Sequence, residues 1–138
     1  MNLYSRIKPN TLLHIIHRKE DWIDGRQDLT PETTALQVAT IKQPAGQTFR
    51  PHKHIPNERI IPITNECWVI LTGSVKATYY DIDNSVLHED VLLPGDVTIT
   101  VGEGGHNYLF MKDGVALEVK NGPWVGTEKD KEFICEQL

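Results

Sequence analysis

The sequence predicts an all-β protein, an antiparallel sandwich or barrel that follows a short irregular or helical N-terminal segment. Many short runs are rich in β-branched and aromatic residues, and clusters of Gly, Pro, Asn and Asp separate them. No helix-length apolar periodicity lies between these runs. Frequent short strands with turn residues between them are typical of antiparallel sandwiches and barrels.

Strands and turns are expected to alternate along most of the chain. The expected strands are, in order, residues 35–43, 47–54, 67–82, 85–93, 96–101, 106–113 and 115–120. Turns are expected between them, including Thr72-Gly73 and Asp113-Gly114. A helix is expected only at residues 12–22, LLHIIHRKEDW, and residues 28–36 are expected to form the loop that leads into the core.

Length and composition predict one domain over residues 1–138, with a core barrel over about residues 35–122. The net charge of -5 disfavours a nucleic-acid partner, since phosphate binding requires a basic face. Cys67 and Cys135 are too few for a disulfide framework and fit a reducing compartment. The apolar cluster at residues 11–16 is too short for a signal peptide or a membrane span. We therefore expect a cytoplasmic protein without a membrane partner.

Strand parity brings ligand-type side chains onto shared faces. His52 and His54 face the same side of an extended segment, and Glu66 shares a face with Trp68 on the next long strand. His106 begins a third such set. Three imidazoles and one carboxylate form a competent set for a divalent first-row metal, so His52, His54, Glu66 and His106 are the predicted ligands. Iron, manganese, nickel and zinc suit this set equally.

A simpler interpretation competes with the metal site, because many His-x-His pairs lie on exposed strand faces. We interpret His14, His17 and His88 as structural or surface residues. Glu58 is an alternative carboxylate ligand to Glu66. Glu66 is favoured because it begins an apolar strand that holds a ligand rigidly, whereas two prolines flank Glu58 in a predicted loop.

Glycines frame these residues in a pattern that resembles the two motifs of the cupin superfamily. Gly46-QTFRP-His52-Lys53-His54 and Glu66-CWVILT-Gly73 match the first motif, and Gly95 with His106 match the second. The chain departs from the motifs in an eleven-residue spacer at 55–65, and in Val101 and Glu103, where the family commonly has proline and glycine.

A narrower resemblance covers most of the chain after residue 35. The stretches RPHKH, LTG, YYDIDNSVLHEDVLLPGD, GGH and EVKNGPW resemble the WbuC-type cupin-fold metalloproteins, which are often associated with bacterial polysaccharide gene clusters. This resemblance implies an RmlC-like double-stranded β-helix (jelly-roll barrel), a bound metal and a homodimer. It implies no settled reaction, because one fold hosts many activities.

Two further residues are candidates for catalysis. Arg50 shares the parity of the histidines and would bind a carboxylate or phosphate at the barrel mouth, although a rim arginine extended into solvent is an equal alternative. Tyr108 shares the face of His106 and would donate a proton, although inward aromatics are more often core residues. Cys67 has the opposite parity to Glu66 and is expected to pack in the interior.

The sequence is compatible with three functions. The first is a metalloenzyme, such as an isomerase, epimerase or dioxygenase, that acts on a small oxygen-rich substrate (a sugar or a keto/hydroxy acid). The second is a metal-dependent binding or sensor protein for a small ligand. The third is a metal-free sugar epimerase with a His base and Tyr108 as acid. Residues 55–65 are expected to form a lid over the site.

Overall fold

The computed structural model describes residues 1–134 and confirms the all-β class. Cys135 lies outside the described residues. The strands are β1 (Asn2–Tyr4), β2 (Leu12–His17), β3 (Gly25–Asp28), β4 (Ala39–Lys42), β5 (Glu66–Tyr80), β6 (Val86–Leu92), β7 (Val97–Thr100) and β8 (Gly105–Lys120). Two short helical turns accompany them, a 3-10 turn at Lys19–Asp21 and α1 at Thr127–Asp130.

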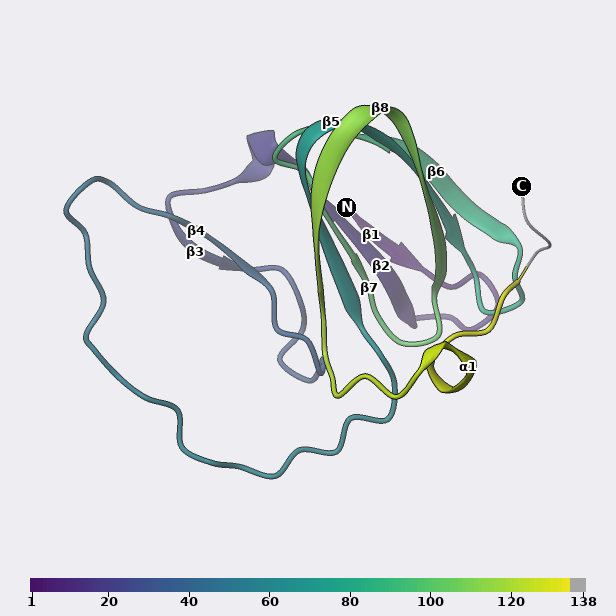
Figure 1. Cartoon of the computed structure of the whole chain (residues 1–138), viewed down its shortest axis with the longest axis horizontal. Helices are drawn as coiled ribbons and strands as arrows, with labels where there is room; N and C mark the ends of the chain where they lie inside the picture. The colour runs from purple at the N-terminus through teal and green to yellow at the C-terminus, as the bar shows by residue number, and fades with distance from the viewer. Residues whose placement is uncertain (135–138) are drawn as a thin grey trace.

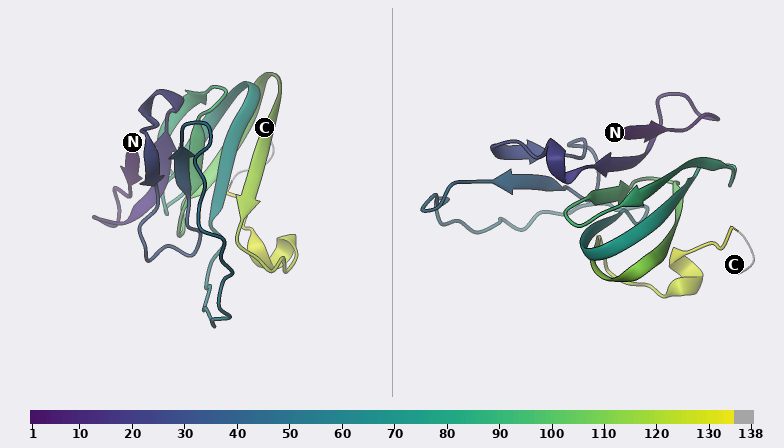
Figure 2. Two further views of the ribbon diagram at one scale, coloured as in Figure 1. Left: turned by 90° about the vertical axis from the view of Figure 1, so that its left-hand side faces the viewer. Right: turned by 90° about the horizontal axis from the view of Figure 1, so that it is seen from above.

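Antiparallel pairing joins most strands into one curled sheet (Figure 1). Its order is β1-β2-β7-β5-β6, and β8 pairs with β5 along nearly the whole length of both strands. β3 and β4 pair with each other in a separate two-stranded sheet, which lies beside the curled sheet (Figure 2). Strand β5 is central, because it pairs with β6, β7 and β8.

The two longest strands bend where the sequence predicts turns. β5 continues through Thr72-Gly73 and β8 continues through Asp113-Gly114, with register shifts between them at this point. Gly73 has φ +79°, and a Cβ there would lie 2.7 Å from both Asp113 O and the Cα of Gly114. A Cβ on Gly114 would collide with the carbonyl oxygen of Thr72. The expected turns are therefore bends of continuous strands, which let the β5–β8 pair fold over on itself.

The predicted N-terminal helix is wrong. Residues 12–17 form β2, and only residues 19–21 form a helical turn. β2 pairs with β1 and β7 and is buried on both faces, with Ile16 in one hydrophobic cluster and Ile15 in another. A continuous apolar run is typical of a strand buried on both sides, and periodicity alone does not distinguish it from a buried helix. β2 thus lies inside the main sheet although it precedes residue 35, where the core barrel is predicted to begin.

Two hydrophobic clusters cover the two faces of the sheet. The first lies inside the curl and contains Ile16, Ile70, Val75, Ala77, Tyr79 and Leu92. The second contains Ile15, Cys67, Val97, Ile99 and Val101. Leu29, Leu36 and Val38, from the connection between β3 and β4, pack on this second cluster. Cys67 thus points away from the face of Glu66, and burial raises the pKa of its thiol to about 11.

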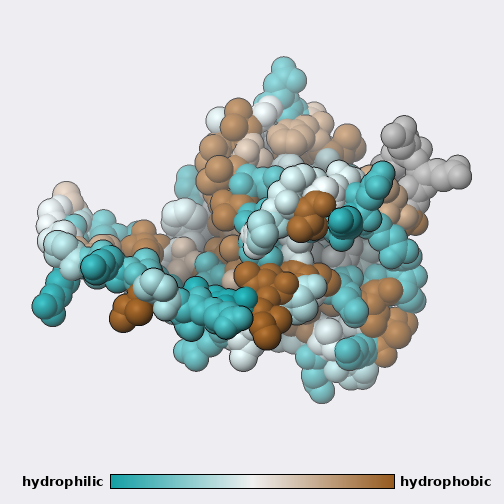
Figure 3. All heavy atoms as spheres, turned by 60° about the horizontal axis from the view of Figure 1, so that its bottom comes forward, coloured by the Kyte–Doolittle hydropathy of each residue, from teal (hydrophilic) through white to brown (hydrophobic). Residues whose placement is uncertain are grey.

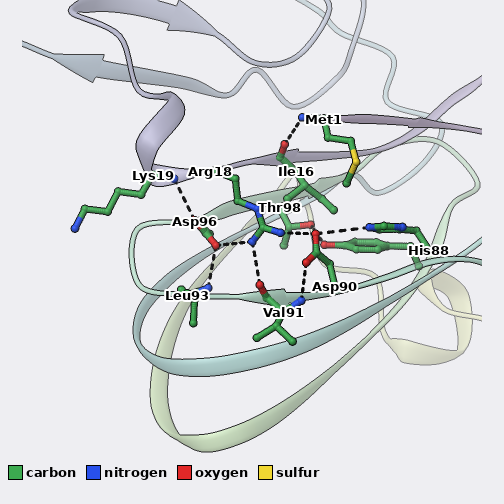
Figure 4. Close-up of polar contacts among 11 residues, drawn as sticks. Met1, Ile16, Arg18, Lys19, His88, Asp90, Val91, Leu93, Asp96 and Thr98 are labelled. Atoms are coloured by element: carbon green, nitrogen blue, oxygen red, sulfur yellow. Dashed lines mark hydrogen bonds and ion pairs between the residues drawn. The ribbon is translucent and has the colours of Figure 1, made fainter.

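An ion-pair network ties the end of β2 to the β6–β7 turn (Figure 4). Arg18 donates hydrogen bonds to Asp96 Oδ2 at 2.7 Å and to the Val91 carbonyl at 2.9 Å, and it also pairs with Asp90. The Asp96 carboxylate accepts from the backbone N–H of Lys19 and of Leu93. Burial opposes the charge on Asp90, but the contacts with Arg18 lower the pKa of that carboxyl.

The strand predicted at residues 47–54 does not form. Residues 43–63, which we call the arm, contain no strand and extend away from the sheet (Figures 1 and 3). Ile55 is 84% exposed and Ile60 is 90% exposed. Four prolines in the arm lack the N–H that a ladder hydrogen bond needs, and no described strand lies alongside the arm to pair with it.

Replacement of Gly114 by alanine is expected to destabilise the fold, because the added Cβ overlaps the Thr72 carbonyl and the two backbones must separate. Overpacking of this kind costs about 1–3 kcal/mol. Urea unfolding followed by circular dichroism measures the effect. Gly122→Ala is the control, since its Cβ would meet only Trp124 N at 3.6 Å. Equal stabilities of the two variants would show that the close approach is not required.

Candidate functional site

A pocket of about 1010 Å³ opens at one end of the curled sheet. Glu66, Thr100 and His106 lie on its wall, and the segments 102–107 and 130–134 form its rim. Glu66 is the first residue of β5, Thr100 is the last of β7 and His106 is near the start of β8. Three strand ends therefore meet in this pocket.

Glu66 and His106 are brought together by the fold of the β5–β8 pair. In the ladder Glu66 is opposite Lys120, whereas His106 is opposite Tyr79 at the other end. A straight strand of that length would separate the two ends by roughly 40 Å. Because both strands bend at Gly73 and Gly114, His106 Nε2 instead lies 3.1 Å from Glu66 Oε1.

The Glu66 carboxylate is buried and accepts two hydrogen bonds. Its Oε1 atom accepts from the indole N–H of Trp68 at 2.6 Å and faces His106 Nε2. Burial raises the pKa of this carboxyl, but the hydrogen bond and charge of His106 and the Trp68 N–H together lower it well below its ordinary value. Glu66 is therefore held as a carboxylate at the pocket wall.

Thr100 links His106 to a second, fully buried histidine. The Thr100 hydroxyl lies 3.0 Å from His106 Nδ1 and 3.1 Å from His14 Nδ1. The other ring nitrogen of His14, Nε2, lies 3.1 Å from the Tyr80 carbonyl oxygen. His14, Thr100 and Glu66 occupy opposed positions on β2, β7 and β5, so they form one row across the sheet.

Aromatic rings pack behind the histidine. The Tyr108 ring stacks on His106 at a centroid distance of 4.9 Å and packs against Trp68 at 4.6 Å in a tilted arrangement. Burial raises the pKa of Tyr108, while Thr98 and Thr100 lower it through hydrogen bonds with the phenol. Tyr108 shares the face of His106, as strand parity predicts, and its hydroxyl is directed at these threonines.

The remaining predicted site residues lie on the arm. Arg50, His52 and His54 are exposed, and the two imidazole rings are 5.5 Å apart at their centroids. His52 Nδ1 contacts the Arg50 carbonyl at 3.0 Å. Within residues 1–134, no three His, Cys, Asp or Glu side chains are grouped closely enough to hold a metal ion. The four predicted ligands therefore do not converge in this conformation, and only Glu66 and His106 meet.

The competing carboxylate, Glu58, is an exposed residue of the arm. Glu66, in contrast, contacts His106 and is fixed by Trp68. The rigidity argument that favoured Glu66 agrees with this placement, and its role as a ligand stays a prediction.

Sequence reasoning missed Thr100 and His14. His14 was interpreted as a structural or surface residue, and its burial fits the structural half of that interpretation. No motif marks either residue. Their place beside Glu66 follows from the register of β2 and β7, which the sequence does not reveal. The indole N–H of Trp68 was likewise unassigned.

The pocket rim carries a negative charge. Glu103, Asp130 and Glu132 lie on the rim and Glu66 on the wall below it, and among the described lining residues Lys131 is the one lysine. Such a rim attracts cations and accepts hydrogen bonds from hydroxyl groups.

No protein-family model, curated protein or solved structure matches the chain. The cupin resemblance therefore stays a prediction. Neither helical turn among residues 1–134 has the length or apolar character needed to cross a membrane.

The buried His14 is expected to make stability depend on pH. Burial lowers its pKa from 6.5 to about 4 in the folded protein. Between these values the unfolded chain binds more protons, so the free energy of unfolding falls as pH decreases, by up to roughly 3 kcal/mol. Urea unfolding at a series of pH values measures this slope. His14→Gln is expected to flatten it and the exposed control His54→Gln to leave it unchanged. An unaltered slope in His14→Gln would contradict the assignment.

Proposed function

We propose that the protein binds a divalent metal ion and uses it to act on a small oxygen-rich substrate, such as a sugar or a keto/hydroxy acid. In this proposal the curled sheet is an RmlC-like double-stranded β-helix, and His52 and His54 join Glu66 and His106 when the arm closes. One observation carries the proposal: the Glu66–His106 pair, 3.1 Å apart, on the wall of an open acidic pocket. A carboxylate and an imidazole are both ligands of first-row metals.

The free edge of β8 offers the arm a place to dock. Among residues 1–134, β8 pairs with β5 alone, so its other edge exposes backbone N–H and C=O groups. Several apolar side chains of β8 are also exposed, namely Leu109, Phe110, Met111, Val115, Leu117 and Val119. A long exposed apolar edge favours the addition of another strand. The arm contributes Phe49 and Ile55, which are exposed as well.

Length and charge agree with closure of the arm. Eleven residues separate His54 from Glu66, and an extended chain of that length spans up to about 40 Å. The arm carries Arg50, Lys53 and Arg59 against one acidic residue, Glu58, and its charge complements the acidic rim. In the closed state Arg50 would lie near the pocket, where its guanidinium fork would bind a carboxylate or phosphate of the substrate.

The same edge supports the expected homodimer. An arm that docks on β8 of a second copy would bury the same apolar residues and deliver the same histidines in trans. A cytoplasmic location is part of the proposal, because Cys67 is a free, buried thiol.

Metal analysis of the untagged protein tests the proposal. We expect about one equivalent of Fe, Mn, Ni or Zn after reconstitution, and loss of metal in Glu66→Gln and in the double variant His52→Gln/His54→Gln. Glu58→Gln is the matched control and is expected to retain metal. Less than about a tenth of an equivalent in the parent protein would refute metal binding. Loss in Glu58→Gln alone would reverse the choice of carboxylate.

Metal bound without turnover, in a screen of sugars, nucleotide-sugars and organic acids, would favour the binding or sensor function. Measurement of molecular mass with and without the arm histidines, at several protein concentrations, distinguishes closure within one chain from docking on a second copy.

A second candidate is metal-free acid–base catalysis, as in a sugar epimerase. It is favoured by the hydrogen-bonded Glu66–His106 pair, which needs no movement of the arm, with Tyr108 stacked on it. A base of this kind abstracts a proton next to a carbonyl group and typically contributes about 10²–10⁴-fold.

This candidate predicts deuterium incorporation into a keto-sugar substrate in D₂O that persists in EDTA. His106→Gln is expected to reduce the rate by about 10²-fold or more, whereas His52→Gln/His54→Gln leaves it unchanged. Loss of the deuterium exchange in EDTA would instead show that the activity depends on a bound metal.

A further inference from the structure

The strongest unassigned feature is the chain of polar contacts behind His106, which ends on a backbone carbonyl. His14 Nε2 lies 3.1 Å from the Tyr80 carbonyl oxygen. A carbonyl oxygen only accepts hydrogen bonds, so Nε2 of His14 must carry a proton and donate it. The direction of the first hydrogen bond is thereby fixed by the backbone.

The second link follows from the burial of His14. The side chain is 0% exposed, and its ring nitrogens contact only the Tyr80 carbonyl and the Thr100 hydroxyl. No carboxylate contacts the ring to stabilise a buried cation, and burial lowers its pKa to about 4. A neutral imidazole with its proton on Nε2 has a bare Nδ1 that only accepts. Thr100 must therefore donate its hydroxyl proton to His14.

The third link sets the state of His106. A threonine hydroxyl has a single proton, and here it is directed at His14. The Thr100 oxygen is then an acceptor toward His106, whose Nδ1 lies 3.0 Å away. His106 Nδ1 must carry a proton in order to donate to it. The Nε2 atom lies 3.1 Å from the Glu66 carboxylate. A carboxylate only accepts hydrogen bonds, so Nε2 also carries a proton, donates it to Glu66 and faces the site.

We propose that His14 and Thr100 are positioning residues, which hold the His106 ring in place with a proton on Nδ1 and direct Nε2 at Glu66 and the pocket. The inference deepens the proposed function, on which its relevance to metal binding or catalysis rests. In either case Nε2 is the working atom: it gives up the proton that it donates to Glu66 and offers the lone pair to a cation, or it exchanges that proton with a substrate. A histidine that binds a metal or acts in acid–base catalysis is commonly oriented by a hydrogen bond to its second ring nitrogen.

Close packing holds in place the chain of contacts from His14 through Thr100 to His106, which we call the relay. A Cβ on Gly104 would lie 2.7 Å from His14 Cε1 and 2.9 Å from Nε2, so glycine at this position leaves just enough room for the buried ring. Gly104 lies two residues before His106, on the segment that leads into β8. The same segment thus packs against His14 and positions His106.

Nitrogen-15 NMR of the histidine rings tests the relay without metal or substrate. In the metal-free protein at pH 8 we expect a protonated, pyrrole-type signal for His106 Nδ1 and a pyridine-type signal for His14 Nδ1. Thr100→Ser, which keeps the hydroxyl, is expected to preserve both signals. Thr100→Val is expected to remove the preference of His106 for Nδ1–H. A bare Nδ1 in His106 of the parent protein would overturn the proposal, as would a protonated His106 Nδ1 in Thr100→Val.

A second measurement separates this inference from the proposed function. If the site binds metal, Thr100→Val is expected to weaken Zn(II) binding by about 10–100-fold, and Thr100→Ser by much less. Should no metal bind to the parent protein, the metal proposal fails, while the NMR result still decides the relay. Equal Zn(II) affinity of the parent and Thr100→Val would overturn the positioning role even where the tautomer is as expected.

Discussion

The close approach of β5 and β8 at Gly73 and Gly114 is the constraint on which the rest of the structure depends. A Cβ on either residue would meet the opposite backbone, so two long strands bend together only where both lack side chains. The bend turns one continuous ladder into two facing halves, encloses the cluster around Tyr79, and brings Glu66 against His106. A hydrophobic core and a polar site thus arise from a single local feature of the backbone.

The site is polar inside a β core because its members satisfy one another. His14, Thr100 and Glu66 lie in one row across three strands, and His106 meets that row from the other half of the sheet. Each buried group has a partner: the Tyr80 carbonyl at one end and the Trp68 indole at the other. A buried polar network that is fully hydrogen-bonded is rigid. If one partner were missing, the buried group left unpaired would cost its desolvation free energy. Rigidity of this kind is what a ligand or a base requires.

The sequence predicts the all-β class and the strands from β5 to β8, because their alternation and turn residues are local signals. Parity also places Cys67 and Glu66 on opposite faces, as observed. The sequence predictions that are wrong concern pairing between strands that are distant in the sequence. Residues 12–17 have the same apolar run in a buried strand as in a helix, and only their pairing with β7 decides between them. Residues 47–54 alternate like a strand but have no described strand beside them to supply hydrogen bonds. The contact of Thr100 with two histidines depends on register and carries no sequence signal.

The free edge of β8 and the extended arm are two consequences of one topology. β8 pairs with β5 alone among the described strands, and the arm leads through Thr64 and Asn65 into β5 at Glu66. The chain just after the arm is held in place, because Asn65 N–H donates to the Asn121 side chain at 2.8 Å, just past the end of β8. His52 and His54 therefore stay tethered to a point beside the pocket, and any movement of the arm would pivot about that point. A tethered segment has a high effective concentration at its docking edge, so even weak pairing with β8 would populate the closed state.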